Sequence, residues 1–274
     1  MTVSEINVYP IKSCKGFGVT SAKLDEYGLV GDRRMMIVDS NGTALTQRDL
    51  HQMGFIEPSV IHEILTLRAP GMQDLVVPFD VFSDNQVAVD VWDDSCIALD
   101  CGNTVAEWVA DYLHTTCRLV RMDQNFQRPI DKNYSTRDEH VSFADGFPLL
   151  LISEASLEDL NSRLDVRITM NRFRPSIVVK GCDAFAEDAW KTIRIGELLF
   201  EVVKPCARCV VTTIDPNTGR SGHEPLKTLA TYRRTNDGKI MFGQNVIHIK
   251  KSGTLTLGAE ISVVNWIHDI RLEK

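Results

Sequence analysis

Short runs of β-branched and aliphatic residues, separated by turn signals, recur along most of this 274-residue chain. The clearest is a hairpin signal in which residues 34–39 and 43–46 flank Asn41-Gly42, a dipeptide that accepts the positive φ of a tight turn. Many short strands at this spacing favour a barrel or a sandwich. The other strand-like runs are residues 63–67, 86–91, 118–121, 176–179, 192–203, 246–249 and 254–264.

Only three segments carry clear helical signals. Thr104 and Glu107 form a capping-box signature, followed by one apolar face that includes Val105 and Val109. Ser153 can cap a second helix, which would bury leucines 157, 160 and 164, and proline 225 can open a third with leucines 226 and 229 inward. The polar run 122–140 lacks sustained periodicity and is expected to connect two halves. We therefore expect a strand-rich, mixed α and β protein in two closely packed parts.

Composition limits the classes of function. The chain is 43% hydrophobic, which is enough to bury a sizeable core, and its formal net charge of −7 argues against general nucleic-acid binding. No apolar run approaches the roughly 18 residues of a membrane span, and the first residues, MTVSE, lack the features of a signal peptide. We expect a cytoplasmic protein without nucleic-acid or membrane partners. Its seven irregularly spaced cysteines suit reduced thiols.

Two of these cysteines, Cys206 and Cys209, form a C-x-x-C pair within the segment KPCARCVVTTI. A zinc site would need two further ligands, and no histidine pair has the H-x3-5-H spacing. A redox dithiol should open a helix, whereas the β-branched run 210–214 predicts a strand. Cys96 and Cys101 have a C-x4-C spacing, but the third cysteine of the plant-type iron–sulfur pattern is missing. The remaining alternative is a pair of inert core thiols.

Positive charge lies near these thiols and near other strand ends. Lys204 and Arg208 flank the pair and favour a thiolate, although a solvated loop would also account for them. Lys12, Arg33 and Arg174 also lie at the edges of strand-like runs. Guanidinium groups bind phosphate or pterin-like anions in a bidentate manner, so these cations could form one anion site if they converge. The sequence does not show whether they converge, and scattered surface arginines would need no explanation.

Eight segments, spread in order over nearly the whole chain, match one known family. They are YPIKSCKG (9–16), GDRRMMIVD (31–39), FADGFPLLLISEASLEDLN (143–161), NRFRPSIVV (171–179), GCDAFAEDAW (181–190), KPCARCVVTTIDPNTG (204–219), EPLKTL (224–229) and FGQN (242–245). Together they resemble the MOSC-domain proteins. Within these, the most similar group contains the mitochondrial amidoxime-reducing component and its bacterial relatives that detoxify N-hydroxylated bases.

The resemblance implies a molybdenum cofactor, Mo-molybdopterin, bound between a β-rich amino-terminal MOSC-associated domain (residues 1–122) and a MOSC β-barrel domain (residues 123–274). By matching position, Cys209 is the catalytic molybdenum ligand, with Arg208 beside it. Cys182 matches a second cysteine of the family, for which a packing role and a chemical role are both open. The positions matched to the pterin and its phosphate are Lys12, Ser13, Arg33 and Arg174. The other positions matched to the same pocket are Asp145, Gly146, Phe147, Ala207, Arg208 and Asn245. Animal relatives carry a hydroxyl residue at the position of Phe147, so a cofactor contact there would come from the backbone.

The activity implied by the resemblance is the reduction of N-hydroxylated bases and amidoximes. Reduced molybdenum would take the oxygen from the small N-hydroxylated substrate and leave the amine or amidine. Several bacterial relatives carry a carboxy-terminal ferredoxin domain, whereas this sequence ends at Lys274 without one. We therefore expect a separate electron donor, such as a ferredoxin, a flavoprotein reductase or a cytochrome. The alternative is a module that carries the cofactor or transfers sulfur without reductase turnover.

Overall fold

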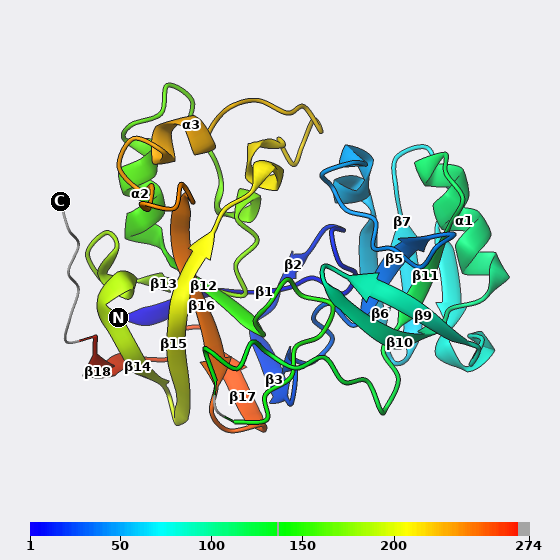
Figure 1. Cartoon of the computed structure of the whole chain (residues 1–274), viewed down its shortest axis with the longest axis horizontal. Helices are drawn as coiled ribbons and strands as arrows, with labels where there is room; N and C mark the ends of the chain where they lie inside the picture. Colours follow the sequence, from blue (N-terminus) through cyan, green and yellow to red (C-terminus); the bar gives the residue numbers. More distant parts are fainter. Residues whose placement is uncertain (136, 268–274) are drawn as a thin grey trace.

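The computed structural model describes residues 1–135 and 137–267, and it is rich in strands, as predicted. Its largest sheet has eight strands in the order β18-β14-β15-β16-β12-β13-β1-β2 and forms one lobe of the molecule (Figure 1). A bridge between Thr2 and Glu260 links the start of β1 to the turn before β18, so the sheet curls towards closure. The strands are β1 (Thr2–Val8), β2 (Phe17–Gly18), β12 (Leu149–Ser153), β13 (Ile177–Lys180), β14 (Trp190–Ile195), β15 (Leu198–Ala207), β16 (Met241–His248) and β18 (Ile261–Trp266).

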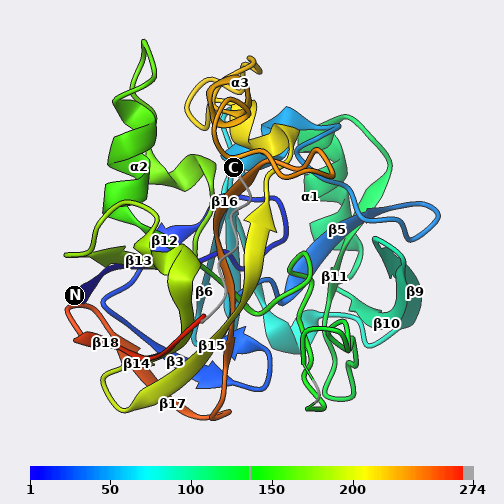
Figure 2. The same cartoon turned by 60° about the vertical axis from the view of Figure 1, so that its left-hand side comes forward.

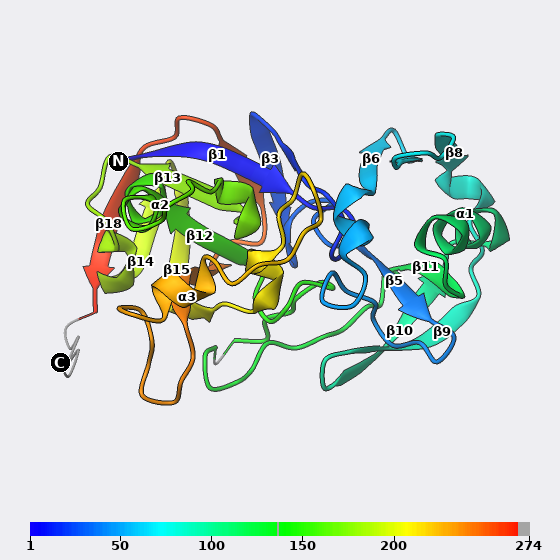
Figure 3. The ribbon, with the colours of Figure 1, turned by 90° about the horizontal axis from the view of Figure 1, so that it is seen from above.

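The second lobe contains two smaller sheets and the longest helix. One sheet is β5 (Met35–Asp39), β11 (Cys117–Arg121), β10 (Asp94–Asp100) and β9 (Gln86–Val91), in that order, and the other is β6 (Glu57–Ile61), β7 (Ile64–Arg68) and β8 (Leu75–Pro78). Helix α1 (Asn103–Leu113) lies at the outer end of this lobe, as seen from above in Figure 3. Its side chains Val105 and Val109 share a core with Leu65 of β7 and Leu119 of β11.

The first residues of the chain add strands to the lobe that the second half mainly forms. Strand β1 pairs with β13, and β3 (Ser21–Asp25) pairs with both β4 (Gly28–Leu29) and β17 (Gly253–Thr256). The two lobes are therefore interleaved in sequence. The domain division at residue 122 stays a prediction.

Several local predictions agree with the structure. The turn at Asn41-Gly42 forms, with Gly42 at φ +83° and its N–H donating to Asp39 O at 3.1 Å. Ser153 caps α2 (Glu154–Asn161), since its hydroxyl accepts a hydrogen bond from the Ser156 N–H at 3.1 Å. Helix α3 (Leu226–Leu229) follows Pro225 but makes a single turn. In Figure 2 both helices lie above the curled sheet.

Several predictions of secondary structure were wrong. The runs 192–203 and 254–264 each form two strands, because Gly196 (φ +56°) and Gly258 (φ +78°) make turns within apolar sequence. The capping box at Thr104 does not form: α1 already begins at Asn103 and has no side-chain cap. The run 122–140 was expected to be a connection without periodic structure, and the part of it that the structure describes holds no helix or strand, although Phe126 and Arg128 are buried there.

The structure also bears on membrane crossing by helices. Within residues 1–135 and 137–267, no helix is long and apolar enough to cross a bilayer.

Candidate functional site

A cavity between the two lobes gathers most of the residues predicted from the sequence. It encloses about 850 Å³, including its open mouth. Ala207 is not among the lining residues: it is the exposed last residue of β15. The predicted residues that line the cavity are Lys12, Ser13, Arg33, Asp145, Gly146, Phe147, Arg174, Arg208, Cys209 and Asn245.

Strand order explains how distant parts of the chain meet here. Strand β1 runs antiparallel to β13, and β12 runs parallel to β13, so the end of β1 and the starts of β12 and β13 lie at one edge. Lys12, Asp145 and Arg174 lie in the loops at that edge. Strand β15 shifts register twice against β16, and such bulges bend a strand. Cys209 follows the end of this bent strand.

A buried ammonium group and a carboxylate form one wall of the cavity. The Lys12 side chain is buried, and its Nζ donates to Asp145 Oδ1 at 2.7 Å and to Phe143 O at 3.0 Å. Burial lowers the pKa of Lys12, which Asp145 opposes. Lys12, and beyond it Arg33 and Arg48, hold the pKa of Asp145 well below its usual range. Asp145 is therefore a carboxylate at neutral pH, and it holds Lys12 in place.

Two arginines stack on one buried tyrosine at the back of the cavity. The Cζ atoms of Arg33 and Arg174 each lie 4.3 Å from the centre of the Tyr9 ring. Arg33 also donates to Asp32 Oδ2 at 2.6 Å, and Asp32 Oδ1 accepts from the Tyr9 N–H at 2.8 Å. The Arg174 guanidinium makes no hydrogen bond or ion pair with another residue that the structure describes. Its donors are therefore available to a ligand in the cavity.

Backbone strain is concentrated at the same place. Ser13, Arg33 and Arg174 have φ values of +64°, +49° and +55°, in the left-handed region that residues other than glycine rarely adopt. Each such residue costs on the order of 1–3 kcal/mol, and such strain clusters at binding and catalytic sites. Three strained residues around one cavity are consistent with a ligand-binding role for it.

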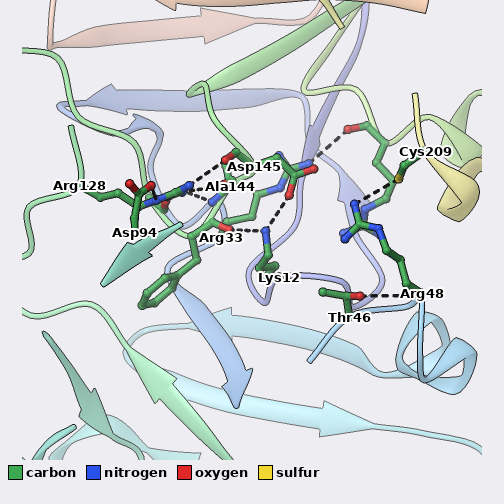
Figure 4. Close-up of polar contacts among 12 residues, drawn as sticks. Lys12, Arg33, Thr46, Arg48, Asp94, Arg128, Ala144, Asp145 and Cys209 are labelled. Atoms are coloured by element: carbon green, nitrogen blue, oxygen red, sulfur yellow. Dashed lines mark hydrogen bonds and ion pairs between the residues drawn. The ribbon is translucent and has the colours of Figure 1, made fainter. Parts of the chain in front are cut away.

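The two thiols of the C-x-x-C pair have different partners. Arg48 Nη2 donates to Cys209 Sγ at 3.4 Å (Figure 4). Arg208 Nη1 instead donates to Cys206 Sγ at 3.0 Å. The cation that donates a hydrogen bond to Cys209 is therefore Arg48, and the adjacent Arg208 bonds to Cys206. Arg48 had no signal in the sequence, because it lies in a turn 161 residues before Cys209.

The segment after the pair is also not a strand. Residues Val210–Thr213 form the 3₁₀ helix η5, with Cys209 at its N-terminal end. The hydroxyls of Thr212 and Thr213 donate to the carbonyls of Cys209 and Val210 at 2.9 and 2.8 Å. Such local side-chain bonds to the backbone compete with strand pairing and override the β propensity of these residues.

Arg128 is a second residue that the sequence did not reveal. Its side chain lies within the polar run 122–140 yet is only 2% exposed. It donates to three carbonyls of the loop that carries Asp145, and to Asp94 Oδ2 at 2.7 Å (Figure 4). The carbonyls are those of Ser142 (3.0 Å), Ala144 (2.5 Å) and Asp145 (2.8 Å).

The other cysteines lie outside this cavity lining. Cys182 packs against the core of the curled sheet, and Cys96 and Cys101 are buried in two separate cores. Burial raises the pKa of Cys101 to about 12. Among the residues that the structure describes, no group of three or more His, Cys, Asp or Glu side chains is arranged to hold a metal ion.

Two predicted neighbours of the site contact aromatic rings. Lys204 Nζ lies 4.2 Å from the centre of the Tyr134 ring and 5.2 Å from that of Phe147. The Phe147 ring is buried against Tyr134, which leaves its backbone as the part able to face a ligand.

The chemistry of these donors suits an anionic, phosphate-bearing ligand that also carries a thiophilic metal. Cations outnumber anions among the charged side chains of the lining, which has one lysine, five arginines and a single carboxylate, that of Asp145, paired with Lys12. Arg208 Nε is buried and has no hydrogen-bond partner in the described part of the chain. Buried polar atoms of folded proteins nearly always have such a partner. Cys209 adds a partly exposed thiol at the same cavity.

Comparison with known proteins gives consistent results for both halves. Residues 1–116 match the MOSC N-terminal beta barrel domain, and residues 138–262 match the MOSC domain. Mitochondrial amidoxime reducing component 2 of Bos taurus is 38% identical over 247 residues, which cover 85% of this chain and 72% of that protein. Mitochondrial amidoxime-reducing component 1 is 36% identical in Mus musculus (94% of this chain, 80% of that protein) and 35% identical in Homo sapiens (94% and 81%).

Proposed function

Since this chain belongs to the family of MOSC-domain proteins that includes the mitochondrial amidoxime-reducing components, we propose that it is a molybdenum-dependent reductase of N-hydroxylated compounds. The observation that carries this proposal is the position of the Cys209 thiol in a cavity lined by cations from both lobes. The proposed substrates are small amidoximes and N-hydroxylated bases.

The residues that would hold the cofactor fall into two groups. Lys12, Ser13, Arg33 and Arg174 would bind the pterin and its phosphate, and Cys209 would be the protein ligand of the metal. When bound, the cofactor supplies the two-electron chemistry that removes the oxygen of an N–OH group as water and leaves N–H. The protein contributes binding, orientation and electrostatics around that centre.

The charges of the cavity constrain how the chain takes part. Reduction of N–OH to N–H and water consumes two electrons and two protons. Asp145 is a poor proton donor, because Lys12 and the nearby arginines keep it ionised. Its role in the proposal is to orient Lys12, with which it forms an ion pair at 2.7 Å. We propose that the electrons come from a separate redox protein.

The test is to purify the protein from cells that make the cofactor, and to measure molybdenum, pterin and iron per chain. Reduction of benzamidoxime and of N-hydroxylaminopurine is then followed with a chemical electron donor. The proposal expects molybdenum and pterin near one per chain, no iron, and formation of benzamidine and the aminopurine. A protein that binds the cofactor but reduces neither compound would be a carrier. A protein that binds no molybdenum would contradict the proposal as a whole.

A further inference from the structure

Trp92 has an unusual conformation for a tryptophan. It lies in the turn between β9 and β10 at φ +60°, and its side chain is 50% exposed. The left-handed region is rare for bulky residues, and such strain persists only where the surroundings hold it. Glycine or asparagine would suit this turn better on conformational grounds. The requirements of the turn therefore do not explain why a tryptophan is at this position.

The ring lies against two residues of the cavity wall. Its centre is 4.3 Å from Arg48 Cζ and 5.5 Å from Lys12 Nζ. Arg48 in turn reaches Cys209 Sγ at 3.4 Å. Trp92 itself is not among the lining residues, but it contacts two of them, and one of these, Arg48, leads to the thiol.

The turn that carries Trp92 is anchored to the loop that carries Asp145. Asp94, two residues further on, accepts a hydrogen bond from Arg128 Nε at 2.7 Å (Figure 4). The buried Arg128 also binds the carbonyls of Ser142 and Ala144, in the loop that carries Asp145. These bonds fix the indole ring with respect to the cavity.

We propose that Trp92 is a substrate-contacting residue against which flat, aromatic N-hydroxylated compounds stack. This inference rests on the proposed function, because a cofactor held by Lys12, Arg33 and Arg174 would occupy the interior and leave the substrate at the rim. An exposed indole ring beside Arg48 offers a planar apolar surface there, and aromatic ligands stack well on such surfaces. Stacking on this ring favours aryl amidoximes and N-hydroxylated bases as substrates over aliphatic amidoximes.

The experiment compares Trp92→Leu, Trp92→Phe and the control Trp266→Leu in the cofactor-loaded protein. Trp266 is also 50% exposed but lies on β18, outside the cavity lining. The measured quantity is the ratio of kcat/KM for benzamidoxime to that for acetamidoxime, which has no ring. We expect Trp92→Leu to lower the ratio about tenfold, which corresponds to about 1.4 kcal/mol. Trp92→Phe should keep most of the ratio, and Trp266→Leu all of it.

The substrate ratio separates stacking from a structural role. Equal losses for both substrates in Trp92→Leu would mean that the ring acts only by holding Arg48, and would overturn the inference. An unchanged ratio would overturn it too.

A binding measurement keeps the inference distinct from the proposed function. Benzamidoxime is titrated into the oxidised, cofactor-loaded protein without an electron donor, and the heat of binding is measured by isothermal titration calorimetry. We expect equal binding in the wild type and in Trp266→Leu, and weaker binding in Trp92→Leu. If no substrate is reduced but this pattern holds, the proposed function fails and the stacking site stands. If the wild type shows no binding, the stacking site fails whatever the activity.

Discussion

The guanidinium of Arg48 donates a hydrogen bond to the sulfur of Cys209 at 3.4 Å, although the two residues lie 161 positions apart in the chain. The adjacent cation, Arg208, instead donates to Cys206 at 3.0 Å and to Phe173 O at 2.7 Å. The two thiols are therefore unequal. Cys209 faces a cation from the other lobe, whereas Cys206, at the end of β15, is held by Arg208, two positions further along the chain.

Substitution of each thiol should reveal this difference. Cys209→Ala should abolish the reduction of N-hydroxylated compounds while much of the pterin stays bound, because the lysine and arginine contacts do not depend on the metal ligand. Cys206→Ala should retain substantial activity. Benzamidoxime reduction and the molybdenum and pterin contents are measured for both variants. An inactive Cys206→Ala beside an active Cys209→Ala would reverse the assignment, and equal partial losses would favour a shared role for the pair.

Removal of Arg174 should weaken binding of the cofactor. Its donors have no partner among the described residues, and the loss of one charge-assisted bond of about 2 kcal/mol corresponds to roughly thirtyfold in affinity. Arg174→Ala should therefore lower pterin occupancy, Arg174→Lys should lower it less, and Arg163→Ala, outside the cavity lining, should not change it. Pterin content is compared between the wild type and those variants that have the same melting temperature as the wild type. Full occupancy in a folded Arg174→Ala protein would exclude this arginine from the site.

Loss of the Arg128 side chain should reduce stability. Arg128→Met leaves the carbonyls of Ser142, Ala144 and Asp145 without this donor in a buried loop, and each unpaired buried group costs about 1–3 kcal/mol. We expect a loss of at least about 3 kcal/mol in the free energy of unfolding, measured in urea. The control is Arg68→Met, whose exposed ion pair with Asp74 should contribute less than about 1 kcal/mol. Similar losses in the two variants would contradict the anchoring role of Arg128.

Stability should fall in mild acid because of His248. Burial, and then the charge of Lys251, lowers its pKa to about 4 from the ordinary 6.5. The unfolded chain therefore binds a proton between about pH 6.5 and pH 4 that the folded chain does not, and stability is lost as the pH falls through this window. The slope from this residue is at most about 1.4 kcal/mol per pH unit.

The matching variant is His248→Gln, which has no proton to bind in this range. Urea midpoints at pH 7.5 and pH 5 should differ less in the variant than in the wild type. An equal pH dependence in both proteins would show that His248 does not titrate on unfolding in this range.

Much of the local structure followed from the sequence. Asn41-Gly42 predicted its turn because few other residues tolerate a positive φ there, and Ser153 predicted the start of α2 because its hydroxyl satisfies a free N–H of the first turn. Both signals depend on neighbouring residues alone. The prediction failed for run 210–214, where β-branched residues suggested a strand but the threonine hydroxyls close a helical turn.

The sequence by itself determined which residue types the cavity would receive and, through ordered motifs, which family the chain belongs to. Only the tertiary structure decided which cation meets which thiol, and that Arg128 and Trp92 contact residues of the cavity. The physical reason is that the pairings of Arg48 with Cys209 and of Arg128 with Asp94 are set by strand order and bulges. No interaction between chain neighbours encodes them.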